Sequence, residues 1–116
     1  MKTPLELVQL QLDAYNSRDL ATFLTAFSDR VQSYRLPDMT LVLDGKEAFG
    51  AFHATNRFVH EGLRADLVNR MVVGNRVIDH ELIHGLGPEP METAVIFEVV
   101  DGLIEKVFAI PAKTLS

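Results

Sequence analysis

Apolar residues recur every three or four positions up to about residue 60, and every second position after it. The first period is typical of helices and the second of strands, so the chain is predicted to place its helices before its strands. The first helix begins clearly, because Thr3 can cap it, Pro4 suits its first position and Glu6 completes a capping box. The apolar stripe of this helix is predicted at Leu5, Val8, Leu12 and Tyr15.

Two further helices and a short hairpin follow. Asp19 is predicted to cap a second helix. Its buried side would carry Leu20, Phe23, Leu24 and Phe27. Strands are predicted at Val31–Leu36 and Thr40–Leu43, with a turn at Pro37-Asp38. Gly45 is then predicted to open a third helix, with a buried stripe of Ala48, Phe49, Phe52 and Val59.

The second half of the chain predicts two hairpins. Gly74-Asn75 and Asp101-Gly102 are two-residue turn signals that each stand between two strand-like runs. The four predicted strands are Leu63–Val73, Arg76–Leu86, Glu92–Val100 and Leu103–Ile110. Three helices followed by a long antiparallel sheet predict an α+β fold, in one domain that covers residues 1–116.

The first hairpin predicts which side chains share a face of the sheet. A two-residue turn pairs Val73 with Arg76, and side chains then alternate between the faces. One face would carry Val68, Arg70, Val72, Val77, Asp79 and Glu81. The other would carry Leu67, Asn69, Met71, Ile78, His80 and Leu82. Because both faces are substantially apolar, we expect helices to cover one and a second copy of the chain to cover the other.

Arg70, Asp79 and Glu81 form the main cluster of candidate functional residues. They lie among valines, and charges embedded in apolar surface are costly unless they are paired. One interpretation is a pocket floor, with Glu81 or Asp79 as a base and Arg70 orienting a carbonyl or anionic group. The other is a cross-strand salt bridge on a solvated face.

The second hairpin presents a similar choice. An unbroken register places Glu98 opposite Glu105, and directly opposed like charges are unfavourable. The two carboxylates would share a proton and take part in acid–base chemistry, or they would face water, or a bulge would shift the register.

Composition narrows the classes of protein. The chain has 116 residues, 47% of them hydrophobic and 23% charged, with a net charge of −5 and no cysteine. These values exclude a disordered chain, a disulfide scaffold and thiol catalysis, and the negative charge disfavours nucleic acids and anionic membranes. No targeting or membrane-spanning segment is recognisable, so we expect a cytoplasmic protein.

His80 to His84 match the zinc-protease string H-E-x-x-H, but the surrounding residues predict a strand. On a strand the two histidines would stand ~13 Å apart, at ~3.3 Å per residue, and could not bind one ion. We therefore expect no metal site.

Four short strings, taken in order, resemble the nuclear transport factor 2-like superfamily over nearly the whole chain. They are Asp13–Leu20, Phe27–Val31, Asp44–Ala48 and Val100–Ile104. The small SnoaL-like or steroid-isomerase-like proteins are the most similar branch. The resemblance implies a cystatin-like cone, with a cavity between the helices and the concave sheet and a dimer through the convex side.

The resemblance also suggests which face points into the cavity. It implies the face of Asp79 and Glu81, so that Glu81, Asp79 and Arg70 become candidate catalytic residues. Tyr15, Tyr34, Phe52 and Phe97 are the candidate substrate-binding residues. The expected ligand is a small apolar molecule, and no cofactor is expected.

No named activity of the superfamily carries over, however. The three positions that hold the catalytic groups of ketosteroid isomerases read Arg35, Gln11 and Val95 in this chain. The positions that hold an arginine and an aspartate in limonene epoxide hydrolases are occupied by Glu81 and Ile83 in this chain.

Two functions therefore remain open. The first is a cofactor-independent isomerase, lyase or hydrolase that uses acid–base chemistry on a carbonyl or hydroxyl compound. The second is a ligand-binding or interaction module without chemistry. An enzyme should keep a desolvated carboxylate of raised pKa in an open cavity, whereas a scaffold should fill the cavity with its phenylalanines.

Overall fold

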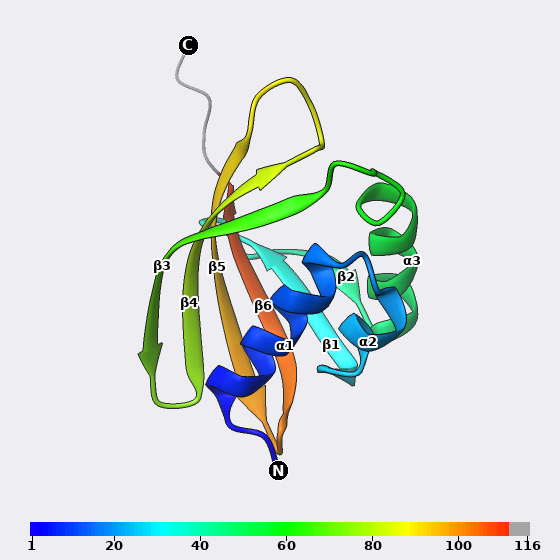
Figure 1. The fold of residues 1–116 in the computed structure, drawn as a ribbon. Helices are drawn as coiled ribbons and strands as arrows, with labels where there is room; N and C mark the ends of the chain where they lie inside the picture. The colour runs from blue at the N-terminus through cyan, green and yellow to red at the C-terminus, as the bar shows by residue number, and fades with distance from the viewer. Residues whose placement is uncertain (112–116) are drawn as a thin grey trace.

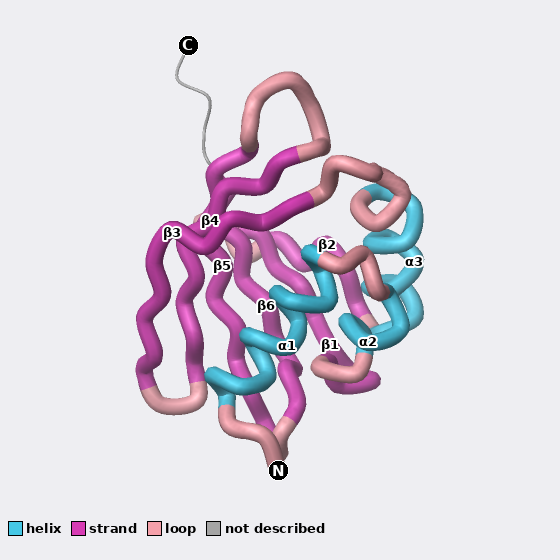
Figure 2. Tube along the Cα trace, viewed as in Figure 1, coloured by secondary structure: helices cyan, strands magenta, loops and turns pink. Residues whose placement is uncertain are grey.

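Three helices lie against one side of a curved six-stranded sheet (Figure 1). This computed structural model describes residues 1–111. The elements are α1 (Pro4–Asn16), α2 (Leu20–Leu24), β1 (Phe27–Arg35), β2 (Thr40–Asp44), α3 (Lys46–Asn56), β3 (Arg64–Val73), β4 (Arg76–His84), β5 (Met91–Val100) and β6 (Leu103–Pro111). The strand order is β2-β1-β6-β5-β4-β3 (Figure 2), and the predicted α+β class is confirmed.

The predicted start of α1 is confirmed. The Thr3 hydroxyl accepts a hydrogen bond from the Glu6 amide at 3.1 Å, and the Glu6 carboxylate accepts one from the Thr3 amide at 2.8 Å. The buried side differs from the predicted stripe, because Leu5 is exposed. The buried residues are Leu7, Val8, Gln11, Leu12, Ala14 and Tyr15, one face of the helix centred slightly away from Leu5.

The second helix is shorter than the apolar pattern predicts. It ends at Leu24, and Phe27 belongs to β1 instead. The Ile104 amide donates a hydrogen bond to the Ala26 carbonyl at 2.9 Å, so the backbone before Phe27 is already paired with β6. Phe27 is fully buried, as expected, but as a strand residue.

One strand pairing differs from a purely antiparallel sheet. Four of the five neighbouring pairs are antiparallel, and the pair β1 and β6 is parallel. Turn residues reveal the antiparallel partners, because hairpins are local in sequence. The pairing of β1 with β6 joins segments more than seventy residues apart, so no local sequence signal predicts it.

The register of the first hairpin is confirmed close to its turn and wrong beyond it. Arg70 pairs with Asp79 and Val72 with Val77, as predicted. A bulge at Val68 then shifts the register, so that Leu67 rather than Val68 lies opposite Glu81. Leu67 therefore shares the face of Glu81, whereas the unbroken alternation placed it on the other face.

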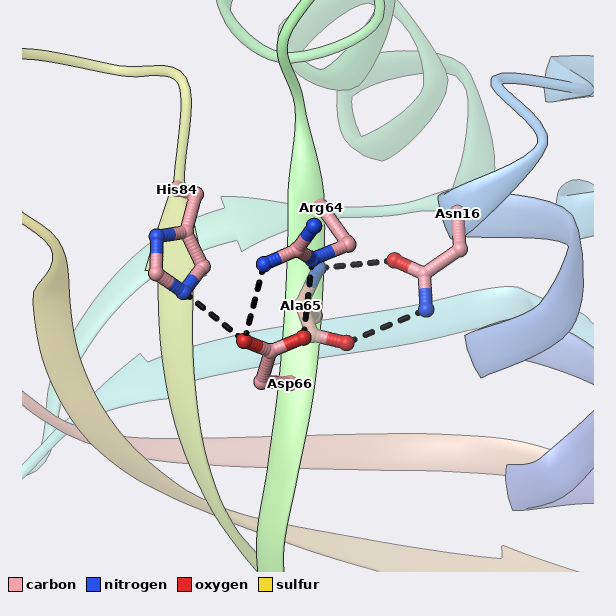
Figure 3. A network of polar contacts seen from close by, with 5 residues as sticks. All are labelled: Asn16, Arg64, Ala65, Asp66 and His84. Atoms are coloured by element: carbon pink, nitrogen blue, oxygen red, sulfur yellow. Dashed lines mark hydrogen bonds and ion pairs between the residues drawn. The ribbon is translucent and has the colours of Figure 1, made fainter.

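This bulge decides which residue near the start of β3 faces the helices. Ala65 pairs with Ile83, and both are buried on the helix side of the sheet. Asp66 falls on the opposite face, where it accepts hydrogen bonds from Arg64 at 2.8 Å and from the His84 ring at 2.9 Å (Figure 3). Without the bulge, a carboxylate would replace the Ala65 methyl group on the helix side.

Asn16 fastens the edge strand β3 to the end of α1. Its side-chain oxygen accepts from the Ala65 amide at 2.7 Å, and its side-chain nitrogen donates to the Ala65 carbonyl at 3.0 Å (Figure 3). An edge strand leaves such backbone groups unpaired, and Asn16 supplies both partners. The helix and the strand are thereby held at a fixed distance at this point.

The second hairpin also contains a bulge. The shift between Glu98 and Val99 places Glu98 opposite Lys106, so it does not face Glu105. Glu105 instead forms an ion pair with Arg30 at 3.0 Å. The bulge alternative is confirmed, and the shared-proton alternative for Glu98 and Glu105 is wrong.

The face of the sheet away from the helices carries a continuous apolar row. Successive pairings across five strands align Tyr34, Phe108, Ile96, Ile78 and Met71. Leu67, predicted to belong here, is on the other face because of the bulge. A row of this kind is larger than the scattered apolar residues of a typical monomer surface.

We expect this row to form a homodimer, and Met71→Glu to break it. Met71 is 56% exposed, so a charge there should leave the fold intact while it opposes burial against a second copy. Light scattering should give twice the chain mass of 13.0 kDa for the wild type and the single mass for the variant. Val59→Glu, at another exposed apolar residue away from the sheet, is the control. A wild type that stays monomeric at micromolar concentration would contradict the expectation.

Among residues 1–111, no helix is both long enough and apolar enough to cross a bilayer.

Candidate functional site

A cavity of about 400 Å³ lies between the helices and the concave face of the sheet. Its walls are mainly apolar. They include five phenylalanines, namely Phe23, Phe27, Phe49, Phe52 and Phe97. These side chains border the cavity and leave it open. The polar residues of the lining are Gln11, Tyr15, Ser33, Tyr34, Arg35, His53, Arg57, Glu81 and Thr93. An open, mainly apolar cavity with a few polar groups is the usual form of a small-molecule site.

Among residues 1–111, Glu81 is the only residue that contributes a carboxylate to this lining. It points from the middle of β4 toward the helices, its residue is 6% exposed, and no side chain or amide of residues 1–111 donates a hydrogen bond to it. Burial raises the pKa of Glu81 to about 7, and the nearby negative charge of Asp79 acts in the same direction. The carboxyl group is therefore divided between its two protonation states near neutral pH, as a group that both removes and returns a proton requires.

Arg70 and Asp79 lie outside the cavity lining, although they share the sheet face of Glu81. Two hydrogen bonds of 2.6 and 2.9 Å join the Arg70 guanidinium to both Asp79 oxygens, and a third of 2.7 Å reaches Gln9 on α1. Asp79 is completely buried. Both Asp79 oxygens accept hydrogen bonds from Arg70, so this geometry does not support the predicted roles of Asp79 as a base and of Arg70 as a substrate anchor. The pair instead links the sheet to helix α1.

Tyr15 contributes a phenol to the wall opposite the sheet. The residue is 8% exposed, and its hydroxyl oxygen is buried and meets no group of residues 1–111 in hydrogen-bond geometry. The Arg57 side chain nevertheless approaches closely enough that its charge and a hydrogen-bond interaction act to lower the phenol pKa. Burial raises the pKa of Tyr15 to about 12, so the hydroxyl keeps its proton at neutral pH. A buried donor without a partner costs free energy, and a bound carbonyl or hydroxyl oxygen would satisfy it.

The hydroxyl of Tyr34, a candidate substrate-binding residue, is already hydrogen-bonded within the sheet. The residue borders the cavity, but its ring stacks on Phe108 at 5.4 Å between centroids and its hydroxyl donates to Gln32 at 3.0 Å. Its partner in the sheet is Phe108, in the apolar row on the far face. Its neighbours Ser33 and Arg35 lie on the cavity side, because side chains alternate along β1.

His53 and Arg57 also line the cavity, although they were not among the site residues predicted from the sequence. The signal was present, because Phe49, His53 and Arg57 follow one another at steps of four along one face of α3 and its end. The Phe49 carbonyl can only accept, so the His53 Nδ1 at 2.8 Å carries the hydrogen and Nε2 keeps a lone pair. Burial lowers the pKa of His53 to about 4, and the ring is neutral at physiological pH.

The positions that correspond to the catalytic groups of ketosteroid isomerases all border the same cavity. In this chain they are Arg35, Gln11 and Val95, and none is a carboxylic acid or a phenol. Among residues 1–111, the carboxylate of this cavity is that of Glu81, and Tyr15 contributes a phenol.

The predicted strand context of the two histidines in the zinc-like string is confirmed. His80 and His84 lie on β4 on the face away from the cavity, and their Nε2 atoms contact different carboxylates, Glu92 at 2.6 Å and Asp66 at 2.9 Å. Within residues 1–111, no three metal-binding side chains gather closely enough to hold an ion.

Solved structures share this architecture at low sequence identity. An uncharacterised cystatin-fold protein from Novosphingobium aromaticivorans superposes with a TM-score of 0.82 at 20% identity, covering 95% of this chain and 99% of that one. A candidate ketosteroid isomerase from Kribbella flavida gives 0.80 at 19% identity, over 95% and 78% of the two chains. A candidate polyketide cyclase from Sinorhizobium meliloti gives 0.75 at 16% identity, over 89% and 92%. At these identities the likeness concerns the fold.

A search of the curated proteins returns no relative with significant sequence similarity. A family model, in contrast, matches residues 8–107 and covers both the helices and the sheet that enclose the cavity. The chain belongs to the SnoaL-like domain family, within the nuclear transport factor 2-like superfamily.

Proposed function

We propose that this protein is a cofactor-independent enzyme that moves a proton on a small, largely apolar carbonyl compound, as in an isomerisation or a cyclisation. The observation that carries the proposal is Glu81, a buried carboxyl group with a pKa of about 7 in an open apolar cavity. A non-catalytic binding module would have no use for such a group, and burying it costs stability. The similar folds of a candidate ketosteroid isomerase and a candidate polyketide cyclase support the same class of reaction.

The proposed reaction uses two groups of the chain. The ionised Glu81 takes a proton from the carbon next to the substrate carbonyl, and the electrons of the broken C–H bond move toward the carbonyl oxygen. The Tyr15 hydroxyl donates a hydrogen bond to that oxygen as it becomes negative. If the substrate has a double bond between its β- and γ-carbons, the resulting dienolate takes the proton back from Glu81 at the γ-carbon. The double bond then lies between the α- and β-carbons, which completes an isomerisation without any other reactant.

Glu81→Gln tests the proposal directly. The amide has nearly the same shape but cannot accept the proton, so the rate of exchange of the α-hydrogens of a bound ketone for deuterium should fall by about 100-fold or more. Nuclear magnetic resonance in heavy water measures this rate for a panel of small aryl and alkyl ketones. Glu98→Gln removes a carboxylate on the far face of the sheet and should leave the rate unchanged. Ketones that bind without any Glu81-dependent exchange would identify the protein as a binding module instead.

Tyr15→Phe should separate catalysis from stability. Loss of a donor to the developing oxyanion is expected to slow exchange by about 100-fold. The free energy of unfolding should stay the same or rise slightly, because the hydroxyl is buried without a partner and its removal leaves no other group unpaired. Exchange kinetics and urea denaturation of the same preparation measure both effects. Unchanged exchange would remove Tyr15 from the mechanism.

A further inference from the structure

The lining of the cavity includes two arginines that form no ion pair with a carboxylate of residues 1–111. Four other arginines form ion pairs, and these are Arg30, Arg64, Arg70 and Arg76. Arg35 and Arg57 form none with the described residues, and they are the two arginines that line the cavity. The chain has a net charge of −5, so two arginines without an ion-pair partner in the lining of this mainly apolar cavity are not explained by a basic surface.

Arg57 is the better placed of the two. It follows the last residue of α3, it is half-buried, and its guanidinium lies over the Phe52 ring at 5.0 Å from the centroid. One of its N–H groups donates to the Asn56 carbonyl at 3.2 Å, at the helix end where a positive charge is favourable. A guanidinium has five N–H donors in a planar fork, so most of them remain available to a ligand.

Three polar groups that differ in their chemistry line the cavity, namely Arg57, Tyr15 and Glu81. The positive charge of Arg57 lowers the pKa of Tyr15 and the negative charge of Glu81 raises it, so both groups are close to the phenol. The charges that shift the pKa of Glu81, by contrast, are those of Asp79 and Arg70. Arg57, Tyr15 and Glu81 line the same cavity, so a ligand that reaches all three would meet a cation, a hydrogen-bond donor and a carboxyl group.

We infer that the ligand is a small apolar oxo acid, with its carboxylate on Arg57, its carbonyl oxygen on Tyr15 and its reacting carbon near Glu81. A guanidinium over an aromatic ring, in a mainly apolar wall, pairs with a carboxylate through two parallel hydrogen bonds. Arg35, exposed on the cavity side of β1, adds a second positive charge to the same cavity. The placement of a reacting carbon near Glu81 depends on the proposed function being correct. The anion site at Arg57 does not depend on it.

A matched pair of probes tests the anion site. β-Benzoylpropionate and its methyl ester share the aromatic ketone and differ only in the carboxylate. Isothermal titration should give a dissociation constant about tenfold lower for the acid in the wild type, and raising the ionic strength should reduce this preference. Arg57→Gln should weaken binding of the acid about tenfold and leave the ester unchanged, while Arg57→Lys should retain part of the preference.

Arg76→Gln is the control for net charge, because Arg76 pairs with Glu98 on the far face of the sheet. It should leave both dissociation constants unchanged. The inference is overturned if the ester binds as tightly as the acid, if Arg57→Gln keeps the preference, or if neither probe binds at millimolar concentration. The wild type gives a decision even if Arg57→Gln fails to fold, since an ester that binds the wild type as tightly as the acid contradicts an anion site.

Deuterium exchange at the carbon next to the ketone separates this inference from the proposed function. Exchange that depends on Glu81 without any preference for the acid overturns the anion site and supports the enzyme. A preference for the acid that depends on Arg57, without exchange, supports the anion site and contradicts the enzyme.

Discussion

Asp79→Ala is expected to lower the free energy of unfolding by about 3–5 kcal/mol, which for a small domain is a large part of the total. The substitution leaves Arg70 with its positive charge and without its carboxylate partner. Arg70 is 13% exposed, and it cannot avoid the cost by losing its proton, because a guanidinium stays protonated at every pH at which the protein is folded. The effect comes mainly from the unpaired buried charge rather than from the lost hydrogen bonds.

The same change should loosen the contact between α1 and the sheet. Arg70 donates to Gln9 at 2.7 Å while it holds Asp79, so the guanidinium orientation that reaches the helix depends on the carboxylate. Without Asp79, no carboxylate holds the guanidinium in the orientation that reaches Gln9. We therefore expect faster amide hydrogen exchange in α1 in addition to the lower global stability.

Chemical denaturation at neutral pH measures the first effect, with Glu98→Ala as the control. Glu98 also pairs with an arginine of β4 at 3.2 Å, but Arg76 is more than half exposed there. An exposed pair of this kind contributes under about 1 kcal/mol. Equal, small effects of the two substitutions would show that Arg70 and Asp79 form an ordinary solvated pair.

Glu81→Gln is expected to stabilise the protein by about 3 kcal/mol near pH 8 and to have little effect near pH 4. The pKa of Glu81 is raised from 4.5 to about 7 in the folded protein, because burial disfavours the charged form. Between these two values the unfolded chain is ionised while the folded chain holds the proton. The unfolded state therefore binds fewer protons, and the contribution of Glu81 to stability falls as the pH rises from 4.5 through 7.

The amide of the variant does not titrate, so the difference between the variant and the wild type isolates this contribution. Urea denaturation of both proteins at a series of pH values gives the curve. His53 titrates in the opposite sense, because its lowered pKa of about 4 makes the folded state lose stability as the pH falls below 6.5. That contribution is common to both proteins and cancels. A difference that does not change with pH would contradict the raised pKa of Glu81.

These two predictions assign different roles to neighbouring carboxylates on one strand. Asp79 is fully paired, so its removal destabilises, whereas Glu81 is unpaired at the cavity, so its neutralisation stabilises. A residue that costs stability and lies at a cavity is typical of a functional site. If Glu81→Gln is more stable and also inactive, stability and activity are opposed at this position.

The sequence by itself determines the elements and much of the pairing in this protein. The capping box at Thr3 and Glu6, the turns at Gly74-Asn75 and Asp101-Gly102 and the two apolar periods are local signals, and each reports on residues close in the chain. Gly74 and Gly102 adopt positive φ values of 59° and 78°. Glycine reaches such values without steric cost, which explains why its presence in the sequence predicts these turns. The pairing of Arg70 with Asp79 follows from the first turn by counting.

Only the tertiary structure decides the bulges, the parallel pairing of β1 with β6, and the contents of the cavity. One extra residue at Val68 reverses the faces of everything before it in β3, which sends Asp66 outward and brings Ala65 to the cavity. The division between a paired Asp79 and an unpaired Glu81 depends on where α1 crosses the sheet, and the cavity positions of His53 and Arg57 depend on how α3 packs. These are contacts between segments far apart in sequence, and the burial that gives Glu81 its raised pKa exists only after those segments have packed together.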